Sequence, residues 1–591
     1  MPVSFPLNFY IDLLPMKNVF SLIACLVISI VMFQYRLAYS DLTKGEPPLK
    51  ITEWDAFGYY IYLPSFFIYH DYKQLSWVSA IDTKYKVTGG NGVQAQKADN
   101  GNYAFKYLGG VAIMELPFFL IAHVVAKETG YPPDGFSPPY QYIVSFGIIL
   151  YCILGIFLLR RILLLYFSDA TTAITLLAVC LATNFIDYAA VENGQSHAPI
   201  FLLYVLVIYT TIKWHQRPKA IWAALTGYII GLATISRPTE AIMLFIPLLW
   251  DTHTKEAASK KWQIVKQHKG QIYIAVLFGF IGIAPQLIYW KMATGSFIYD
   301  VGSAWDFLTP HFRVLFGWEK GWFIYTPITV FFIVGMFFMK KFPFCKSVIW
   351  FCFLNIYIII AWRDWHYGGT YATRALVQSY PAFSLAFAAF TEHLRNSKWR
   401  WLFYAICLYL IPVNLFQITQ YRKTIIHYDD MNRRYYGRVY LNTHPSPLDM
   451  SLLDNNEILN SENNYDQKVL VDSVYIKPAQ FPATSAYTLF QQNIKANAGK
   501  IWLKVECAVK APGCLWQSFI NANLKTGDSV KHARVRLYSP ISNNDSVNRY
   551  VFYMSVPPYF ASANAKVYIT SAFNFQGTVH ELKVTELEKR Q

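Results

Sequence analysis

Two carboxylates, Glu53 and Asp55, open the stretch ITEWDAFGYYIYLP, which follows a long apolar segment and runs into a series of aromatic residues. A carboxylate in this position can accept the proton of a hydroxyl group and so activate it as a nucleophile. A helix beginning near Asp55 would place Phe57, Tyr60 and Ile61 on one face, and we expect that face to lie on the membrane surface. The simpler alternative is that Asp55 only caps this helix.

Further polar side chains gather in later loops, where cations can neutralise a phosphate and carboxylates can assist proton transfer. Singly, each has an ordinary role, because a His at a helix start is usually structural and Arg or Lys often anchors an interface. Together they resemble the lining of a site for an anionic headgroup and a sugar. They are Glu192 and His197 in VENGQSHAP, Arg237 in SRPTE, His311 and Lys320 in the loop after Tyr299, and His366 and Arg374 in AWRDWHYGGTYATR.

The composition indicates a membrane protein. Of 591 residues, 54% are hydrophobic and only 15% are charged, whereas charged residues make up about 25% of a soluble domain. The net charge of +16 arises largely in short loops between apolar segments, where cytoplasmic anchoring explains it and nucleic-acid binding is not needed.

Apolar segments of roughly 20 residues predict about eleven membrane crossings. The first is interpreted as an anchor and not as a cleaved signal, since no small-residue cleavage site follows it. Segment 104–126 contains Gly109, Gly110, Glu115 and Pro117, and we expect it to be re-entrant or interfacial. Five basic clusters place one set of loops in the cytoplasm and the polar loops outside. The predicted spans are 18–36, 140–165, 170–188, 195–213, 220–250 (two shorter helices divided at Arg237-Pro238), 271–290, 322–340, 346–362, 376–391 and 401–419.

The pattern changes after residue 420. The transmembrane domain is predicted to cover 1–420, with 37–102 as its first outer loop, and 421–466 to be a linker. From 467 to 591, short segments of period-2 alternation separated by turn residues predict an extracytoplasmic antiparallel β-sandwich. Cys507 and Cys514 have a spacing that would allow a disulfide across a hairpin there. The fold class is therefore a polytopic α-helical membrane protein with a C-terminal β-sandwich.

The stretches EWDAFGYYIYLP, SHAPIFLL, SRPTE and WHYGGTYATR, in this order and placement, resemble the membrane-embedded C-type (GT-C) glycosyltransferases. Within that superfamily the chain is similar to the protein O-mannosyltransferases and the lipid A aminoarabinose transferases, in a bacterial branch. The resemblance covers roughly 18–420. It implies transfer of one sugar from a polyprenyl-phosphate carrier on the outer side of a bacterial inner membrane, with Asp55 at the family's catalytic acidic position and Glu192 at a second one.

The residue chemistry gives matching roles. Asp55 is the expected general base with Glu53 in support, and Arg374, Arg237 and Lys320 are expected to bind the carrier phosphate. The histidines and the aromatic pair are expected to line the substrate site: His197, His311, His366, Tyr59 and Tyr60.

No metal or other cofactor is expected, since no CxxC or His/Cys ligand spacing occurs. The expected partners are the lipid-linked sugar, membrane lipid, and a glycan, lipid or protein acceptor. The sequence leaves the sugar and the acceptor open. Three other functions are alternatives. A lipid-carrier flippase or transporter would place charges at mid-membrane and often shows inverted repeats. An O-antigen-type polymerase or ligase usually carries its large outer loop late in the chain, and a sensor or anchoring protein would leave the polar side chains of the loops unexplained.

Overall fold

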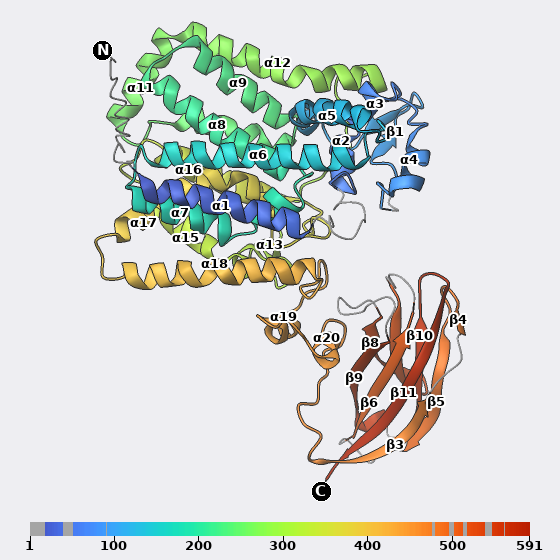
Figure 1. The fold of residues 1–591 in the computed structure, drawn as a ribbon. Coiled ribbons are helices and arrows are strands. Elements are labelled where there is room, and N and C mark those ends of the chain that lie inside the picture. The colour runs from blue at the N-terminus through green and yellow to red at the C-terminus, as the bar shows by residue number, and fades with distance from the viewer. Residues whose placement is uncertain are drawn as a thin grey trace, which may run out of the picture. The chain divides into compact units, whose positions relative to one another are not determined.

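The computed structural model describes residues 18–39, 51–89, 92–474, 479–495, 501–511, 517–537, 547–560 and 562–590. The chain divides into two compact units, Met1–Leu415 and Phe416–Gln591. The first is helical and the second is mainly β-structure, as the sequence predicts (Figure 1).

Six helices of the described residues are long and apolar enough to cross a membrane. Five shorter apolar helical segments accompany them, so the chain is a multi-pass membrane protein, while the number of crossings stays a prediction. The long helices are α1 Val19–Ala38, α5 Gly110–Glu128, α6 Pro138–Leu163, α8 His197–Gln216, α12 Lys269–Thr294 and α18 Arg400–Arg422. The shorter segments are α7 Asp169–Leu181, α9 Ala220–Thr234, Pro238–Leu249, Pro327–Phe338 and α16 Cys345–Ala361.

The helix ends follow local sequence signals. Ser137 is extended at the start of α6, Pro138 occupies its first turn, and Arg160 and Arg161 lie in its last turn, where cations suit the helix dipole. Helix α7 begins after Ser168, whose side chain accepts a hydrogen bond from the backbone N–H of Thr171. These signals explain why the predicted spans agree well with the observed helices at these positions.

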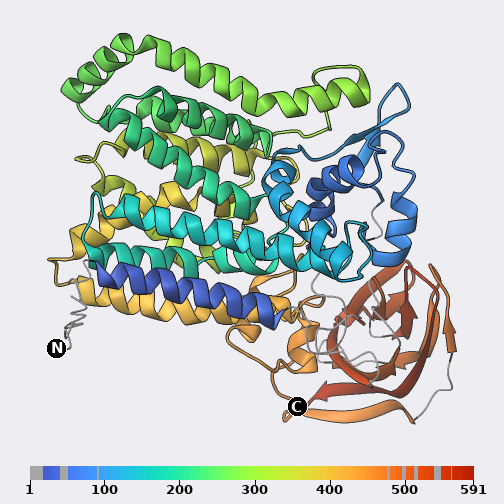
Figure 2. The same cartoon turned by 45° about the horizontal axis from the view of Figure 1, so that its top comes forward.

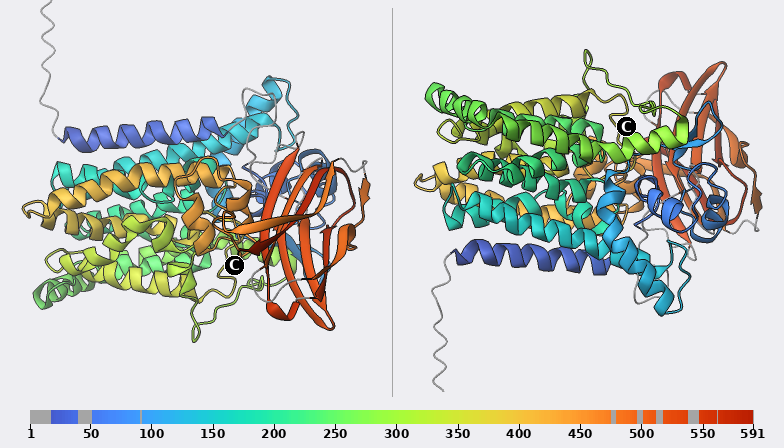
Figure 3. Two further views of the ribbon diagram at one scale, coloured as in Figure 1. Left: turned by 90° about the horizontal axis from the view of Figure 1, so that it is seen from below. Right: turned by 90° about the horizontal axis from the view of Figure 1, so that it is seen from above.

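The helices pack closely around α8, the most buried of the long helices. Helices α1 and α12 lie on opposite flanks of this bundle (Figure 3). Helices α9 and α12 approach through glycine: a Cβ on Gly227 would lie 1.9 Å from the carbonyl oxygen of Ala275. Small residues allow such backbone contact between membrane helices.

One predicted span is divided as expected, and another differs in detail from the observed helices. The segment predicted as two short helices ends one helix at Thr234 and begins the next at Pro238, as expected from a proline. The predicted span 322–340 is broken into α14 Trp322–Tyr325, α15 Val330–Gly335 and 3₁₀ turns, with Pro327 between them. Helix α5 runs through Pro117 without a break and lies obliquely to its neighbours (Figure 3).

The described residues of the predicted first outer loop form a small subdomain at one end of the bundle (Figures 1 and 2). The opposite end carries the lysine-rich helix α11 Lys255–Gln267 (Figure 1). The subdomain comprises α2 Asp55–Tyr60, α3 Tyr62–Phe67, α4 Val78–Tyr85 and the short hairpin β1 Ala95–Lys97 with β2 Tyr103–Phe105. Further short elements on the first unit are α10 Phe245–Leu249, α13 Arg313–Phe316 and α17 Tyr380–Leu394.

The second unit is a sandwich of two antiparallel sheets. One sheet has the strand order β5-β10-β7-β8, and the other β3-β11-β6-β9 with β4 paired to β11. In β6 the inward residues Ile501, Leu503 and Val505 are buried while their neighbours are half-buried, which confirms the predicted alternation. The strands are β3 Tyr465–Val474, β4 Ala479–Phe481, β5 Tyr487–Lys495, β6 Ile501–Lys510, β7 Phe519–Thr526, β8 Ser529–Arg536, β9 Asn548–Val556, β10 Ser562–Thr570 and β11 Phe575–Lys589.

Two features of this unit differ from the expectation, and the predicted disulfide stays a prediction. Strand β7 forms although it contains Asn521 and Asn523, a residue type disfavoured in strands. The predicted linker holds two short helices, α19 Arg433–Val439 and α20 Pro447–Ser451, the second with a capping box. Cys507 is a buried free thiol, and its predicted partner Cys514 lies outside the described residues.

Candidate active site

The aromatic stretch after Asp55 folds as predicted but packs against protein. Phe57, Tyr60 and Ile61 are almost fully buried. The ring of Tyr60 lies 5.9 Å from that of Phe119 and 5.6 Å from that of Phe136. The predicted apolar face is therefore part of the core, which corrects the expectation that it rests on lipid.

Asp55 does not act as a helix cap. It is the first residue of α2, whose preceding residue Trp54 makes no side-chain capping bond and has a φ of 54°. The carboxylate oxygens of Asp55 are instead directed at other elements. Oδ2 accepts a hydrogen bond from Nη2 of Arg374 at 2.6 Å, and Oδ1 accepts one from the hydroxyl of Tyr107 at 2.6 Å. The simple capping interpretation is therefore not supported.

These contacts determine the protonation of Asp55. Burial by itself raises the pKa of the carboxyl, but the charge of Arg374, the hydrogen bonds from Tyr107 and Arg374, and the charge of Lys106 outweigh it. The pKa of Asp55 therefore lies below its ordinary value, and the group is ionised at neutral pH. Its side chain remains 29% exposed, so a hydroxyl from solvent can reach it.

Tyr107 can approach Asp55 because α2 carries a glycine on that side. A Cβ on Gly58 would lie 2.2 Å from the Cδ2 atom of Tyr107, closer than two carbon atoms can pack. The ring of Tyr107 also packs against that of Tyr59, with centroids 4.4 Å apart. Burial, followed by the charge of Asp55, raises the pKa of Tyr107, so this hydroxyl remains a donor.

Arg374 joins two loops that are far apart in sequence. Its Nη1 donates to the Oε1 of Gln195 at 2.8 Å. The amide of Gln195 in turn donates to the Oε2 of Glu192 at 3.2 Å. A continuous set of contacts therefore runs from Tyr107 through Asp55, Arg374 and Gln195 to Glu192.

The loop that carries Glu192 is fixed against the first outer loop. A Cβ on Gly194 would lie 1.9 Å from the carbonyl oxygen of Ile51, so only glycine allows this approach. Asn193 is buried and exchanges two hydrogen bonds with Ser145 of α6. The position of Glu192 near Asp55 thus follows from packing.

Arg237 is close enough to this set of contacts for its charge to act on two tyrosines there. Its charge and that of Arg374 both lower the pKa of Tyr59 and that of Tyr367, although burial raises both pKa values overall. Among the residues that the structure describes, none forms a hydrogen bond or ion pair with the guanidinium of Arg237. A half-buried cation of this kind is available to an anionic ligand.

His197 belongs to a buried network beside the arginines. Its Nδ1 lies 2.8 Å from the Oε1 of Gln378, and the amide of Gln378 donates to Glu240 at 3.1 Å. Glu240 also accepts a hydrogen bond from Tyr204. His197 is almost fully buried, so this geometry gives it a positioning role behind the site.

Lys320 and the other two histidines lie apart from Asp55 in their bonding. The ammonium of Lys320 donates to the carbonyl oxygens of His366 and Gly368 and lies 3.3 Å from the Nδ1 of His366. These acceptors occupy the donors of Lys320, which argues against the predicted phosphate contact. The Nε2 of His311 lies 3.7 Å from the Oδ2 of Asp306.

Three other predicted residues are placed as follows. Tyr59 lies on the site, packed on Tyr107. Tyr60 donates to the carbonyl oxygen of Gly135 at 2.5 Å and is 1% exposed, so it is a core residue. Glu53 is half-buried just before α2, and its backbone carbonyl accepts from Phe57.

The sequence patterns did not identify Tyr107, Gln195 and Lys106 as site residues. Gln195 lies within a motif that was singled out, but only its charged neighbours were considered. Tyr107 and Lys106 precede the glycine pair at 109–110, and no sequence signal distinguishes this tyrosine from the 42 others among the 43 in the chain.

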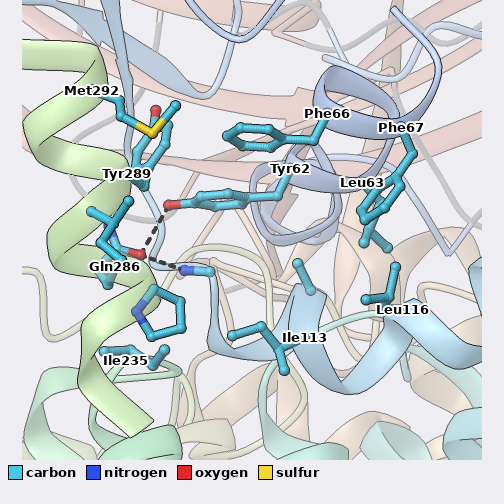
Figure 4. A pocket seen from close by; sticks show the side chains of 14 residues that line it. Tyr62, Leu63, Phe66, Phe67, Ile113, Leu116, Ile235, Gln286, Tyr289 and Met292 are labelled. Carbon is cyan, nitrogen blue, oxygen red and sulfur yellow. Dashed lines mark hydrogen bonds between the residues drawn. The ribbon is translucent and has the colours of Figure 1, made fainter. Parts of the chain in front are cut away.

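An apolar cavity of about 410 Å³ adjoins this site between α3, α5 and α12 (Figure 4). Its lining is almost entirely apolar, with Tyr62, Gln286 and Tyr289 as the members that carry polar side-chain groups. The Oε1 of Gln286 accepts from the backbone N–H of Gly109 at 2.8 Å and from Tyr62 at 3.2 Å. Its Nε2 is buried and has no hydrogen-bond partner within the described ranges. Tyr62 also donates to the carbonyl oxygen of Tyr107, which links the cavity to Asp55.

No group of three or more His, Cys, Asp or Glu side chains in the described part of the chain is arranged to hold a metal ion.

Comparison with known proteins finds no matching family model and no matching curated protein. Solved structures do match. ArnT from Cupriavidus metallidurans in the apo state is 12% identical, with 72% of this chain and 68% of that chain covered and a TM-score of 0.39. The archaeal oligosaccharyltransferase AglB from Archaeoglobus fulgidus, in complex with an inhibitory peptide and a dolichol-phosphate, is 10% identical, with 71% and 57% covered and a TM-score of 0.41.

The arabinosyltransferase EmbB from Mycobacterium smegmatis is 10% identical, with 96% of this chain and 64% of that chain covered and a TM-score of 0.38. The structural neighbours are thus GT-C glycosyltransferases, the superfamily that the sequence resembles. This chain spans about two thirds or less of the length of each. Each of these TM-scores is below 0.5, so what is proposed about the function of this chain is argued from its own residues.

Proposed function

We propose that this chain is an integral membrane glycosyltransferase that moves a single sugar from a polyprenyl-phosphate carrier to an acceptor hydroxyl on the extracytoplasmic side. The observation that carries the proposal is the 2.6 Å contact between Asp55 and Arg374. It joins a carboxylate and a cation that are 319 residues apart in the sequence. Arg237 lies nearby, and none of the described residues forms a hydrogen bond or ion pair with its guanidinium.

The site can perform the reaction by displacement at the anomeric carbon. Asp55 accepts the proton of the acceptor hydroxyl as its oxygen bonds to that carbon. The bond from the carbon to the carrier's phosphate oxygen breaks, and the phosphate leaves with the electron pair. Arg237, and the N–H groups of Arg374 that do not bind Asp55 or Gln195, stabilise the charge that develops on it.

The apolar cavity supports a lipid-borne donor. It lies beside α3, directly after the helix that begins with Asp55, and α12 on its other side is largely exposed. A polyprenyl chain can bury its apolar surface there. The unpartnered Nε2 of Gln286 offers a donor to an oxygen near the head of that chain.

The orientation completes the proposal. The charged loops around Asp55 lie at one end of the bundle, and the lysine-rich α11 lies at the other. Positively charged loops remain in the cytoplasm, so the site and the C-terminal unit are assigned to the extracytoplasmic side of a bacterial inner membrane. The acceptor is a glycan, lipid or protein.

The test is to incubate the purified protein in lipid-detergent micelles with a panel of undecaprenyl-phosphate monosaccharides and to measure released undecaprenyl phosphate by mass spectrometry, with water taking the place of the acceptor hydroxyl. Release from at least one donor is expected for the wild type. Asp55→Asn should bind that donor but release undecaprenyl phosphate at least about 10²-fold more slowly. Asn keeps the shape of the side chain and cannot take the proton of the attacking hydroxyl. Asp99→Asn, an exposed aspartate of the same loop, is the matched control. Near-normal release by Asp55→Asn would show that the base is another group.

A further inference from the structure

The outer face of the four-stranded sheet in the C-terminal unit has an unusual charge distribution. Strands β5, β10, β7 and β8 contain no Asp or Glu. The nearest acidic residue in sequence, Asp528, lies in the turn between β7 and β8. The other sheet is balanced: Lys504 pairs with Glu506, and Lys583 with Asp472. The positive character therefore belongs to one sheet of the sandwich.

The outward positions on this sheet follow from its register. Buried residues such as Ala522, Ala533 and Val567 face the core, so the alternate positions face outward. One row across the strands consists of Gln491, Lys566, Asn523 and His532. The next rows contain Tyr568, Asn521 and Arg534 on one side, and Asn493, Asn564 and Lys525 on the other.

The cations on this face are not neutralised by carboxylates. Arg534 lies over the ring of Phe519 at 4.3 Å, and Lys566 lies near that of Tyr568 at 5.3 Å. Neither these two nor Lys525 forms an ion pair with any residue in the described ranges. The face thus presents fixed positive charge that an anionic partner would complement.

The neutral side chains of the face are mostly amides, and one of them lacks a partner. Gln491 donates to Asn564, and Asn564 donates to Asn493. Asn521 donates to Thr570. In the central row, the Oδ1 of Asn523 is buried and accepts no hydrogen bond from the described residues. This acceptor lies between Lys566 and His532 in the register and requires a donor from outside.

We propose that this face, defined by Lys566, Asn523, Tyr568 and Arg534 with their neighbours, binds an anionic glycan. Carboxylate or phosphate substituents meet the cations, and sugar hydroxyls donate to Asn523 and to the amide row. The ring of Tyr568 supplies an aromatic surface for a sugar ring. A polyanion without hydroxyl groups would satisfy the cations but leave the acceptor of Asn523 unpaired. This inference does not depend on the transferase function.

The experiment measures binding by the full chain in a neutral detergent, with polygalacturonate as the probe. Neutral dextran, poly-glutamate and phosphatidylglycerol vesicles are the comparison ligands. Wild type is expected to bind polygalacturonate with an affinity that falls as salt rises, to bind poly-glutamate more weakly, and not to bind dextran. Lys566→Gln with Arg534→Gln should weaken polygalacturonate binding at least about tenfold, because two charged hydrogen bonds are lost.

A matched double variant on the other sheet, Lys583→Gln with Arg549→Gln, changes the net charge equally and should bind as wild type does. Tyr568→Ala is a second variant of the proposed face that leaves the charge unchanged and should also weaken binding. Equal losses in the two double variants, poly-glutamate bound as tightly as polygalacturonate, or binding to the vesicles alone would each overturn the proposal. So would a wild type that binds no polygalacturonate.

Discussion

Replacing Arg374 tests whether it controls the protonation of Asp55. In Arg374→Gln the carboxylate loses a charged hydrogen bond of 2.6 Å and the charge that most strongly lowers its pKa. A hydrogen bond to a charged group contributes about 1.5–3 kcal/mol. If the bond is fully used in the transition state, transfer should fall about 10- to 150-fold.

The same variant should change the pH dependence in a defined direction. In the wild type the pKa of Asp55 lies below its ordinary value, so the base form is present at neutral pH and is lost only as pH falls through that lowered pKa. Without the charge and the hydrogen bond of Arg374, the pKa of Asp55 rises above its wild-type value, because two of the causes that lower it are gone. The acidic limb of the rate profile should therefore move to higher pH.

Arg374→Lys is the matched control for charge. The lysine keeps the positive charge, so the acidic limb should remain near that of the wild type. One ammonium cannot reproduce both the contact with Asp55 and the 2.8 Å contact with Gln195. Losing the bond to Gln195 should slow transfer about two- to tenfold. Both profiles come from undecaprenyl phosphate release at a series of pH values. An acidic limb that stays in place in Arg374→Gln would refute this reasoning.

Three further predictions follow from single positions. Gly58→Ala should lower the rate of transfer while leaving expression and donor binding unchanged. The new Cβ would lie 2.2 Å from the Cδ2 atom of Tyr107 and would push its ring away from Asp55, so a wild-type rate in this variant would contradict the proposed contact between Tyr107 and Asp55. A Cys introduced at Gly527 should react with an impermeant maleimide in intact cells and one at Ser259 should not; the reverse pattern would invert the orientation. Burial raises the pKa of Cys507 to about 12, so it should be alkylated at pH 8 only after denaturation, and labelling of the folded protein would show that this thiol is accessible.

Much of the architecture was predictable because it depends on local signals. Long apolar segments specify membrane helices, and the proline after Arg237 specifies a break. The alternation from Ile501 to Val509 specifies a strand with one buried face. The choice of Asp55, Arg374 and Arg237 rested on residue type and loop placement, and the structure brings these three into one region.

The roles within that region depended on packing that the sequence does not encode locally. Lys320 is as cationic as Arg237, yet its ammonium donates to backbone carbonyls of the loop at 366–368. No described residue forms a hydrogen bond or ion pair with the guanidinium of Arg237. Tyr60 and Tyr59 are adjacent, but the period of the helix directs one into the core and the other toward Asp55. Tyr107 and Gln195 are neutral and were passed over.

By itself, the sequence determined that this is a polytopic membrane protein with a β-sandwich, and that the polar loops between its apolar segments carry acidic and basic groups. Hydrophobic length, charge bias and two-residue alternation each act within about 20 neighbouring residues, so they can be read without a fold. Only the tertiary structure decided that Tyr107, Asp55, Arg374, Gln195 and Glu192 form one chain of contacts. Those residues come from loops up to 319 positions apart, and contacts at such separation arise from the packing of whole helices and from glycines that let their backbones approach.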